Sequence, residues 1–239
     1  MDEFLTVREL CKDYEGLRAL NRVNFTLRRG NFLSLFGPNG AGKSTLLRIL
    51  ATLAVPTSGE VEVSGFDLGA DQDAFRRQLG VISHQSLLYN HMSALENLIF
   101  YARLYQVDKP EQRACELLEM MGLYPRRHSP VEKFSQGMRQ RLSIARALVN
   151  DPSLLLLDEP FTGLDPHAAN LLMEQLTVLK SRQRTIIMVT HSLEQGLEAA
   201  TTVGILAGGR LVYFQDRETM DLRGFAKLYQ ERVQGGTSP

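Results

Sequence analysis

Residues 37–45 read Gly37-Pro38-Asn39-Gly40-Ala41-Gly42-Lys43-Ser44-Thr45 and match the pattern G-x-x-x-x-G-K-[ST]. An apolar run, residues 31–36, precedes this stretch, and a helical pattern follows it, which is the context that the motif requires. Glycines let the backbone fold tightly, so that several N–H groups converge on phosphate oxygens. The positive end of the following helix adds to this attraction. We therefore expect a nucleotide site, in which Lys43 reaches the β- and γ-phosphates and Ser44 is a ligand of Mg²⁺.

The segments around this loop predict an α/β fold. Short apolar runs alternate with helical patterns, which favours a doubly wound and mostly parallel sheet. The apolar runs are 31–36, 154–157, 185–190 and 203–206, and helical patterns cover 170–179 and 193–200. Near the N-terminus, residues 5–10, 23–27 and 60–63 alternate with a period of two, which is typical of half-buried strands. We expect these to form an antiparallel edge.

The middle of the chain carries helical patterns only. Residues 95–102, 110–121 and 137–150 have helical spacing, with Gly122 and Pro152 as stop signals. This predicts an all-helical subdomain, residues 86–150, inserted into a single domain that covers 1–239. The core lobe would consist of residues 1–85 and 151–215, and a C-terminal helix and tail would follow at 216–239.

Two further candidate site residues come directly after the run Leu154 to Leu157. The sequence continues with Asp158 and Glu159, where a buried strand would leave the sheet. Asp158 can hold Mg²⁺ through water, and Glu159 can orient and polarise the attacking water. Both carboxylates could instead cap the next helix. The phosphate loop upstream favours the catalytic interpretation.

Ser135 is the third candidate, at the start of a basic amphipathic helix. A serine at this position is typical of a helix N-cap, and that alone would explain it. The same capped helix end also presents N–H groups to a phosphate. Residues 134–141 read Phe134-Ser135-Gln136-Gly137-Met138-Arg139-Gln140-Arg141.

Net charge, cysteine content and the length of apolar runs exclude several classes of protein. The chain has 239 residues, with 27 Lys and Arg against 27 Asp and Glu, so the net charge gives no support for nucleic-acid binding. Two distant cysteines, Cys11 and Cys115, exclude a disulfide framework and fit a reducing cytosol. No apolar run is long enough to cross a membrane, and the acidic N-terminus differs from that of a signal peptide.

Taken in order, these motifs resemble the ATP-binding cassette (ABC) family, and the resemblance covers nearly the whole chain. Tyr14 matches the aromatic residue that stacks on adenine, and Gln85 matches the glutamine that joins metal and water to the helical subdomain. His191 matches the histidine that contacts the γ-phosphate. Residues 135–140 stand where the family has its signature, usually Leu-Ser-Gly-Gly-Gln, and residues 163–165 match the loop between two nucleotide sites. The resemblance adds these site residues to the phosphate loop, Asp158 and Glu159: Tyr14, Gln85, Ser135, Gly137, Asp165 and His191.

The resemblance also implies partners. The chain would form a head-to-tail homodimer, with each ATP between Lys43 of one copy and Ser135 of the other. Binding of ATP and Mg²⁺ would close the dimer, and hydrolysis would open it. A separate transmembrane subunit would hold the chain peripherally on the cytoplasmic side of the inner membrane. We expect this subunit to dock near Leu87, Leu88, Tyr89 and Met92, although these side chains could instead pack inside the helical subdomain.

Within the family, residues 83–105 resemble the haem-exporter, cytochrome c maturation type. This implies that ATP hydrolysis powers haem delivery for cytochrome c assembly. One alternative is a subunit that exports a drug, lipid or polysaccharide, and another is a soluble ABC ATPase in assembly. A GTPase switch is not supported, because the chain has no Asn-Lys-x-Asp motif.

Overall fold

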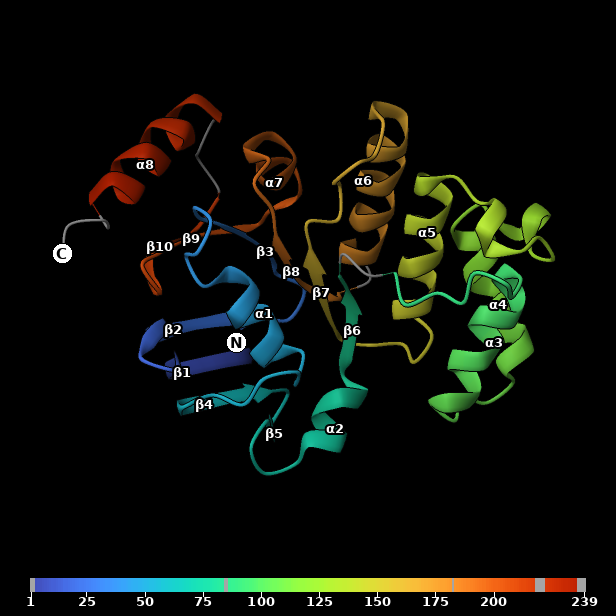
Figure 1. Ribbon diagram of the computed structural model, residues 1–239, viewed down its shortest axis with the longest axis horizontal. Coiled ribbons are helices and arrows are strands. Elements are labelled where there is room, and N and C mark those ends of the chain that lie inside the picture. Colours follow the sequence, from blue (N-terminus) through green and yellow to red (C-terminus); the bar gives the residue numbers. More distant parts are fainter. Residues whose placement is uncertain (1–2, 84–85, 182, 218–221, 236–239) are drawn as a thin grey trace.

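The computed structural model describes residues 3–83, 86–181, 183–217 and 222–235. It contains two β-sheets (Figure 1). The first is antiparallel and has the strand order β2-β1-β4-β5. Its strands are β1 (Glu3–Tyr14), β2 (Leu17–Arg28), β4 (Ser58–Val63) and β5 (Phe66–Asp67). The predicted antiparallel strands are therefore confirmed, and they form a sheet of their own.

The second sheet has the order β10-β9-β3-β8-β7-β6 and is parallel except for β10. Its strands are β3 (Phe32–Phe36), β6 (Leu79–Ile82), β7 (Leu154–Asp158), β8 (Thr185–Val189), β9 (Thr202–Ala207) and β10 (Arg210–Asp216). All residues of β3 are buried, because both faces of this strand are covered. Strands β6 and β10 were not predicted from the sequence.

Helices fill the space between the sheets and cover the larger one. Helix α1 (Lys43–Leu50) shares one apolar core with both sheets through Leu46, Ile49 and Leu50. Helices α7 (Leu193–Ala199) and α8 (Leu222–Gly235) pack with β9 and Phe36 in a separate cluster. Helices α2 (Gln72–Arg77) and α6 (Pro166–Ser181) also belong to this part of the chain.

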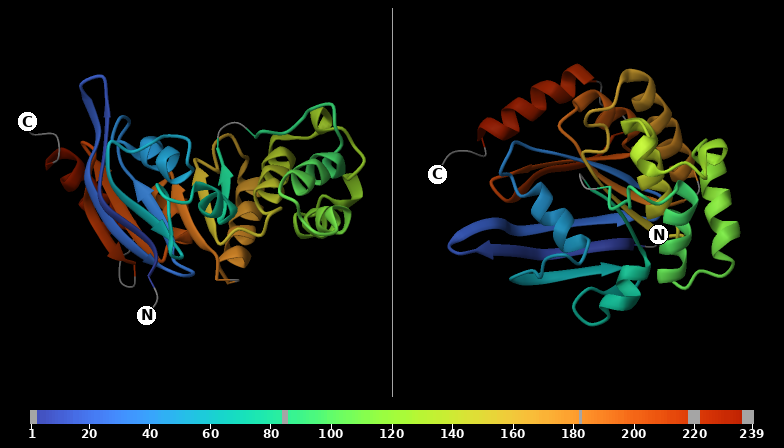
Figure 2. Two further views of the ribbon diagram at one scale, coloured as in Figure 1. Left: turned by 90° about the horizontal axis from the view of Figure 1, so that it is seen from below. Right: turned by 45° about the vertical axis from the view of Figure 1, so that its right-hand side comes forward.

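The inserted all-helical subdomain is confirmed as a helical arm beside the sheets (Figure 2). The arm consists of α3 (Ala94–Leu104), α4 (Pro110–Met120), η1 (Tyr124–Arg126), η2 (Val131–Lys133) and α5 (Gln136–Ala147). Helix α3 begins at a capping box, in which Ser93 and Glu96 exchange hydrogen bonds with each other's backbone. The apolar core of the arm is continuous with that of the sheet, since Leu98 and Leu117 belong to the same cluster as Leu155.

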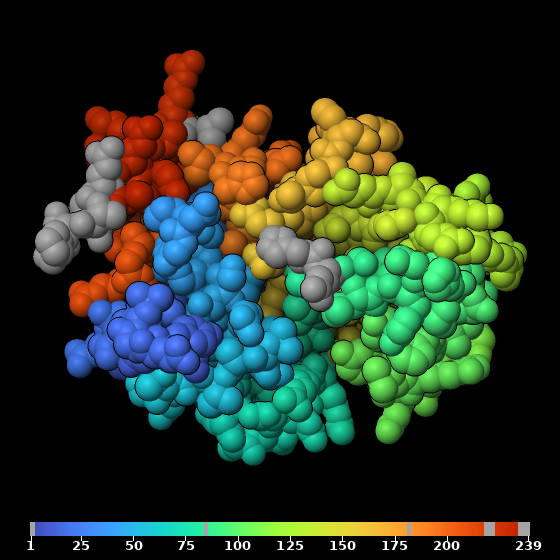
Figure 3. All heavy atoms as spheres, in the orientation of Figure 1, coloured from blue at the N-terminus to red at the C-terminus, as the bar shows by residue number. Residues whose placement is uncertain are grey.

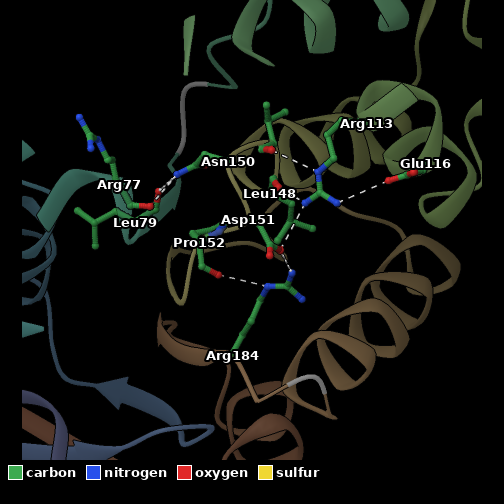
Figure 4. A network of polar contacts seen from close by, with 10 residues as sticks. Arg77, Leu79, Arg113, Glu116, Leu148, Asn150, Asp151, Pro152 and Arg184 are labelled. Atoms are coloured by element: carbon green, nitrogen blue, oxygen red, sulfur yellow. Dashed lines mark hydrogen bonds and ion pairs between the residues drawn. The ribbon is translucent and has the colours of Figure 1, made fainter. Parts of the chain in front are cut away.

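Polar contacts join the residues that follow α5 to the helical arm and to the residues that precede β8 (Figure 4). Arg113 of α4 donates a hydrogen bond of 2.7 Å to the carbonyl of Leu148 and lies 3.4 Å from Asp151 Oδ1. Arg184 forms an ion pair with the same carboxylate from the strand side. Asp151 therefore joins the helical arm to Arg184, the residue directly before β8.

Candidate functional site

The phosphate loop lies between β3 and α1, as predicted. Gly37, Gly40 and Gly42 have φ values of 154°, 78° and 102°. A Cβ atom on Gly37 would lie 2.1 Å from the carbonyl oxygen of Leu206, and one on Gly42 would lie 2.4 Å from that of Ala19. The loop therefore needs glycine at both positions, because backbone fills the space where a side chain would be.

Lys43 holds this loop from inside. Its Nζ donates hydrogen bonds of 2.6 Å to the carbonyl of Gly37 and 2.9 Å to that of Pro38. Burial lowers the pKa of Lys43, and the carboxylates of Glu159 and Asp158 oppose this effect. The ammonium is thus partly desolvated at the place where phosphate charge is expected.

Tyr14 shares a hollow with this loop. The hollow has a volume of about 360 Å³ and is open to the surface, where Tyr14 is 39% exposed. It is lined by Tyr14, Leu17, Arg18, Ala19 and residues 39–45. Lys12 lies over the Tyr14 ring, 4.8 Å from its centroid, and does not line the hollow. One ring face is therefore in contact with a cation, and the hollow offers room for a base beside the ring.

The carboxylates stand where the parallel strands end. Strand β7 ends at Asp158, and His191 follows the neighbouring strand β8. His191 Nδ1 lies 2.7 Å from Glu159 Oε2, and the His191 backbone N–H donates to the same oxygen over 3.3 Å. The Glu159 side chain is 17% exposed and that of His191 is 74% exposed. The structure thus brings Glu159 and His191 into one polar pair.

Both carboxylates open into a second hollow of about 340 Å³. The sequence did not point to most of its wall, which consists of Ser83, Ser86, Gln136, Arg139, Gln140, Asp158, Glu159 and Thr162. Two glutamines of α5 hold the loop that follows Glu159. Gln140 donates to the carbonyl of Pro160 over 3.0 Å, and Gln136 donates to that of Thr162 over 3.3 Å. We call this space the catalytic hollow.

Ser135 lies elsewhere on the surface. It caps α5, since its Oγ accepts a hydrogen bond from the Met138 N–H over 3.3 Å, as the sequence predicts. Asp165 caps α6 in the same way, with Oδ1 2.8 Å from the Ala168 nitrogen. Ser135, Gly137 and Asp165 line one hollow, and none of them lines the hollow around Lys43. Gln85 lies outside the described residues.

Position 138 and the nearby arginines are engaged in the protein's own fold. Met138 packs against the apolar core of the helical arm. Arg139 donates to the carbonyl of Glu132 over 2.9 Å, and Arg141 donates to that of Met121 over 2.9 Å. Both arginines are half-buried, and their guanidinium groups satisfy backbone carbonyls.

The side chains predicted to hold Mg²⁺ supply oxygen donors. Ser44 supplies a hydroxyl oxygen at the start of α1, and Asp158 supplies carboxylate oxygens at the end of β7. Mg²⁺ prefers oxygen ligands, and at nucleotide sites it takes few from protein and the rest from phosphate and water. Among the described residues, no group of three or more His, Cys, Asp and Glu side chains forms a separate metal cluster.

Comparison with known proteins decides the family. The family model described as ABC transporter matches residues 20–162, which include the phosphate loop and both carboxylates. The chain belongs to the ABC transporter family. It is an ABC ATPase domain, in which the two hollows around Lys43 and Glu159 form the candidate active site.

Curated relatives are similar over most of the chain. The Nod factor export ATP-binding protein I of Rhizobium etli is 36% identical over 206 residues, which are 85% of this chain and 65% of that protein. The chain thus spans less than two thirds of that relative's length. The ABC transporter ATP-binding protein NatA of Bacillus subtilis is 36% identical over 200 residues, which are 82% of this chain and 81% of that protein.

Solved ABC structures share the fold. An ATP-binding subunit of an ABC transporter has a TM-score of 0.84 and 32% identity, and the match covers 96% of this chain and 99% of that one. A dimeric ATP-binding cassette in a post-hydrolysis state, bound to ADP and Pi, has a TM-score of 0.80 and 29% identity, with coverage of 90% and 100%. In the described part of this chain, no helix has both the length and the apolar character of a membrane span.

Proposed function

We propose that two copies of this chain bind and hydrolyse two ATP molecules and thereby drive a separate membrane subunit that exports a molecule from the cell. The observation that carries this proposal is the pair formed by Glu159 and His191 at the strand ends beside the phosphate loop. Charged and hydrogen-bonding groups are held there by contacts within the chain, and preorganised groups of this kind are what phosphoryl transfer requires.

Binding would begin at Lys43. Its Nζ donates to the carbonyls of Gly37 and Pro38. The β- and γ-phosphates would bind the same ammonium, because it has three N–H donors and binds anionic oxygens more strongly than neutral carbonyls. Tyr14 would stack on the adenine. Mg²⁺, held by Ser44, Gln85 and Asp158 through water, would neutralise phosphate charge.

Hydrolysis would depend on Glu159. Its carboxylate would accept a proton from the attacking water or orient that water in line with the γ-phosphate. His191 fixes this carboxylate through Nδ1, so Nε2 on the opposite side of the ring points to other partners. We propose that Nε2 contacts the γ-phosphate, which would keep the carboxylate and the phosphate at a fixed separation.

The second copy would complete each site. Ser135, Gly137 and Asp165 lie on a hollow separate from that of Lys43. In a head-to-tail dimer, the N-terminal end of α5 in one copy would face the phosphate loop of the other and present N–H groups to the γ-phosphate. One solved relative is a dimer with ADP and Pi. Hydrolysis by this chain would accordingly require two copies.

The names of the curated relatives support export of a molecule other than haem. They describe Nod factor export and, for a relative from Bacillus subtilis with 32% identity, linearmycin resistance. Haem delivery finds no support among the names of these relatives, so the resemblance to the cytochrome c maturation type remains only a prediction. We therefore propose a lipid-like or drug-like substrate class for the transporter as a whole.

The membrane subunit would dock on exposed apolar side chains of the helical arm. Leu87, Tyr89, Phe100 and Leu104 are 51%, 47%, 40% and 65% exposed. Phe100 and Leu104 line a mainly apolar hollow of about 470 Å³ together with Met92, Glu96, Ile99 and Arg103, and Tyr89 contacts Phe100. We call Leu87, Tyr89, Phe100 and Leu104 the docking surface. The sequence had also suggested Leu88, but that side chain packs against the core of the arm.

This surface lies away from the antiparallel sheet. In the view of Figure 3 the N-terminal strands and the helical arm stand on opposite sides of the molecule. A partner bound to the arm would therefore leave the hollow at Tyr14 uncovered. Binding of nucleotide and docking of the membrane subunit would be compatible.

Membrane fractionation tests this proposal. We expect the chain to sediment with membranes of its native cells, where the partner is present, and to lose this association when Leu87 and Tyr89 are both replaced by serine. Leu53→Ser is the matched control, because Leu53 is 68% exposed and lies after α1. Purified double variant should still hydrolyse ATP. Membrane association that survives in the double variant, with normal folding, would contradict the docking surface.

A further inference from the structure

The residues after Glu159 form two consecutive turns of the backbone. The Thr162 N–H donates to the carbonyl of Glu159 over 3.1 Å. The Leu164 N–H donates to the carbonyl of Phe161, also over 3.1 Å. The two turns thus use the carbonyls of Glu159 and Phe161, whereas those of Pro160 and Thr162 receive donors from outside the loop.

Two glutamines of α5 are these donors. Gln136 and Gln140 lie four residues apart, and side chains at this spacing share one face of a helix. Gln140 donates to the Pro160 carbonyl over 3.0 Å, and Gln136 donates to the Thr162 carbonyl over 3.3 Å. One face of α5 is therefore joined at two carbonyls to residues 159–165, which we call the Glu159 loop.

Gly163 leaves open the space that the Gln136 amide fills. A Cβ atom on Gly163 would lie 2.2 Å from Gln136 Nε2, which is closer than real side chains come. Gly163 has a φ of 75°, in the left-handed region that favours glycine. The glutamine and the glycine therefore fit each other. A larger residue at position 163 would displace the amide from Thr162.

Gln136 lies between two hollows. It lines the catalytic hollow together with Glu159, and it also lines the hollow of Ser135 and Asp165. The usual family signature has glycine at this place, so the contact with Thr162 depends on a side chain that the usual signature lacks. Gln136 thus joins the start of α5 to the wall of the site that contains Glu159 of its own chain.

Further contacts fix Glu159 at the start of the loop. Its N–H donates to the carbonyl of Val189 over 2.9 Å, and its carboxylate contacts His191. Its φ of 50° is uncommon for a residue other than glycine. Such a conformation persists only where the surrounding structure holds it. The bonds from Gln136 and Gln140 are part of that surrounding structure.

We infer that Gln136 is a positioning residue for the Glu159 carboxylate of its own chain. It holds the Glu159 loop against α5 and thereby sets where the carboxylate meets the attacking water. Catalysis is sensitive to such placement, since a shift of about 1 Å can cost roughly 10²-fold in rate. The inference rests on the proposed ATP hydrolysis. It goes beyond that proposal because it assigns to α5 a task within one chain, in addition to the contact with the second copy.

Gln136→Ala tests this, because it removes the donor and keeps a good helix former in α5. We expect kcat of the purified chain for ATP to fall about fivefold, the effect of one lost hydrogen bond. KM for ATP, the melting temperature and the protein concentration at half-maximal specific activity should stay unchanged. Gln112→Ala is the matched control, because Gln112 is an exposed glutamine of α4 that donates to Glu116 over 2.9 Å. Its kcat should equal that of the wild type.

Gly163→Ala tests the same contact from the other side. Its Cβ would displace the Gln136 amide, so kcat should fall as in Gln136→Ala. In the double variant the two losses should not add, because both remove one contact. Gly65→Ala is the control for backbone strain, since Gly65 has a φ of 85° and, in the described part of the chain, no atom lies within 4 Å of a Cβ placed there. It should have wild-type kcat.

Four outcomes would overturn the inference. Gln136→Ala could leave kcat unchanged, or it could lower kcat only together with the melting temperature. It could raise KM or the protein concentration at half-maximal activity, which would place the side chain at the nucleotide of the second copy. Its loss could also add to that of Gly163→Ala.

The proposed function has a separate test: Lys43→Ala must abolish turnover. If it does and Gln136→Ala has no effect, only this inference fails. If Lys43→Ala remains active, the proposed function fails and the inference fails with it.

Discussion

At the scale of single residues, Glu159 has the most specific role in the proposed hydrolysis. One of its carboxylate oxygens contacts both the ring and the backbone of His191. Glu159→Gln keeps the shape of the side chain and removes the basic oxygen. We expect ATP binding to persist and turnover to fall about 10²-fold or more, as for the loss of a general base. Single-turnover kinetics and equilibrium binding of ATP would measure the two effects separately.

Glu174→Gln is the matched control for this change, because Glu174 is an exposed residue of α6. It should have wild-type turnover. Turnover of Glu159→Gln close to that of the wild type would remove Glu159 from the role of base.

Lys12 supplies a second prediction at this scale. Its Nζ donates to the Val55 carbonyl over 2.8 Å and is thereby fixed over the Tyr14 ring. Lys12→Met should weaken ATP affinity about two- to fivefold, since an exposed cation–π contact contributes about 0.5–1 kcal/mol. Turnover at saturating ATP should not change. Titration of ATP binding with wild type, Lys12→Met, Tyr14→Ala and the double variant measures the coupling.

The effect of Lys12→Met should vanish when Tyr14 is already alanine. Lys227→Met, an exposed change on α8, serves as control. An equal loss of affinity in both backgrounds would show that Lys12 acts on the nucleotide through its own charge.

At the scale of elements, Asp151 joins the helical arm to the strands through two arginines. Asp151 has a positive φ of 52°, which asparagine adopts readily, so Asp151→Asn tests the charge without backbone strain. Asp151 is exposed, so we expect a loss of only about 1–2 kcal/mol. That corresponds to a decrease of about 2–8 °C in melting temperature for a domain of this size. Thermal unfolding followed by circular dichroism would measure it.

Asp73→Asn provides the comparison, because Asp73 pairs with Arg76 at 3.4 Å on the surface and its side chain is 84% exposed. This variant should lose at most about 0.5 kcal/mol. Equal melting temperatures for the two variants would show that Asp151 contributes no more than an ordinary surface pair.

The sequence predicted those elements whose signals are local. The phosphate loop, the carboxylates at the end of β7 and the cap at Ser135 each depend on a few neighbouring residues. Strand β6 was missed because its four residues, Leu79 to Ile82, are too few to show a period. The contact of Gln136 with Thr162 was also missed, since it joins residues far apart in the sequence.

Arg146 shows most clearly that sequence pattern does not predict contacts between distant elements. In the sequence it is one more charged residue of a basic amphipathic helix, and a solvent-facing position is the natural expectation. Its burial depends on how α5 lies against β6 and α3, which pattern alone does not specify.

At the scale of the whole molecule, each proposed site needs two chains. Lys43→Ala and Ser135→Arg should each abolish turnover in a homodimer. A mixture of the two variants should recover activity, because one site of the mixed dimer would combine Lys43 of one copy with Ser135 of the other. Random pairing predicts about a quarter of wild-type turnover. Steady-state ATPase assays of the separate and mixed proteins would measure it.

The control is a mixture in which both changes are in the same copy and the other copy is Glu159→Gln. The mixed dimer of this control has no intact site. One site has the changed residue 43 facing an intact Ser135. The other site has an intact Lys43 and the Glu159→Gln change, and it faces the changed residue 135. Recovery in this control, or none in the test mixture, would contradict the head-to-tail arrangement.

The hydrogen bonds of Lys43 to its own loop have a consequence for the speed of nucleotide capture. Because the ammonium donates to the carbonyls of Gly37 and Pro38, contacts within the chain itself hold the loop in shape. Little conformational entropy is then left to lose on association, so the encounter needs no slow rearrangement of this loop. Stopped-flow association of a fluorescent ATP analogue should be a single phase that is linear in concentration. Rate differences among nucleotides should then reside in dissociation.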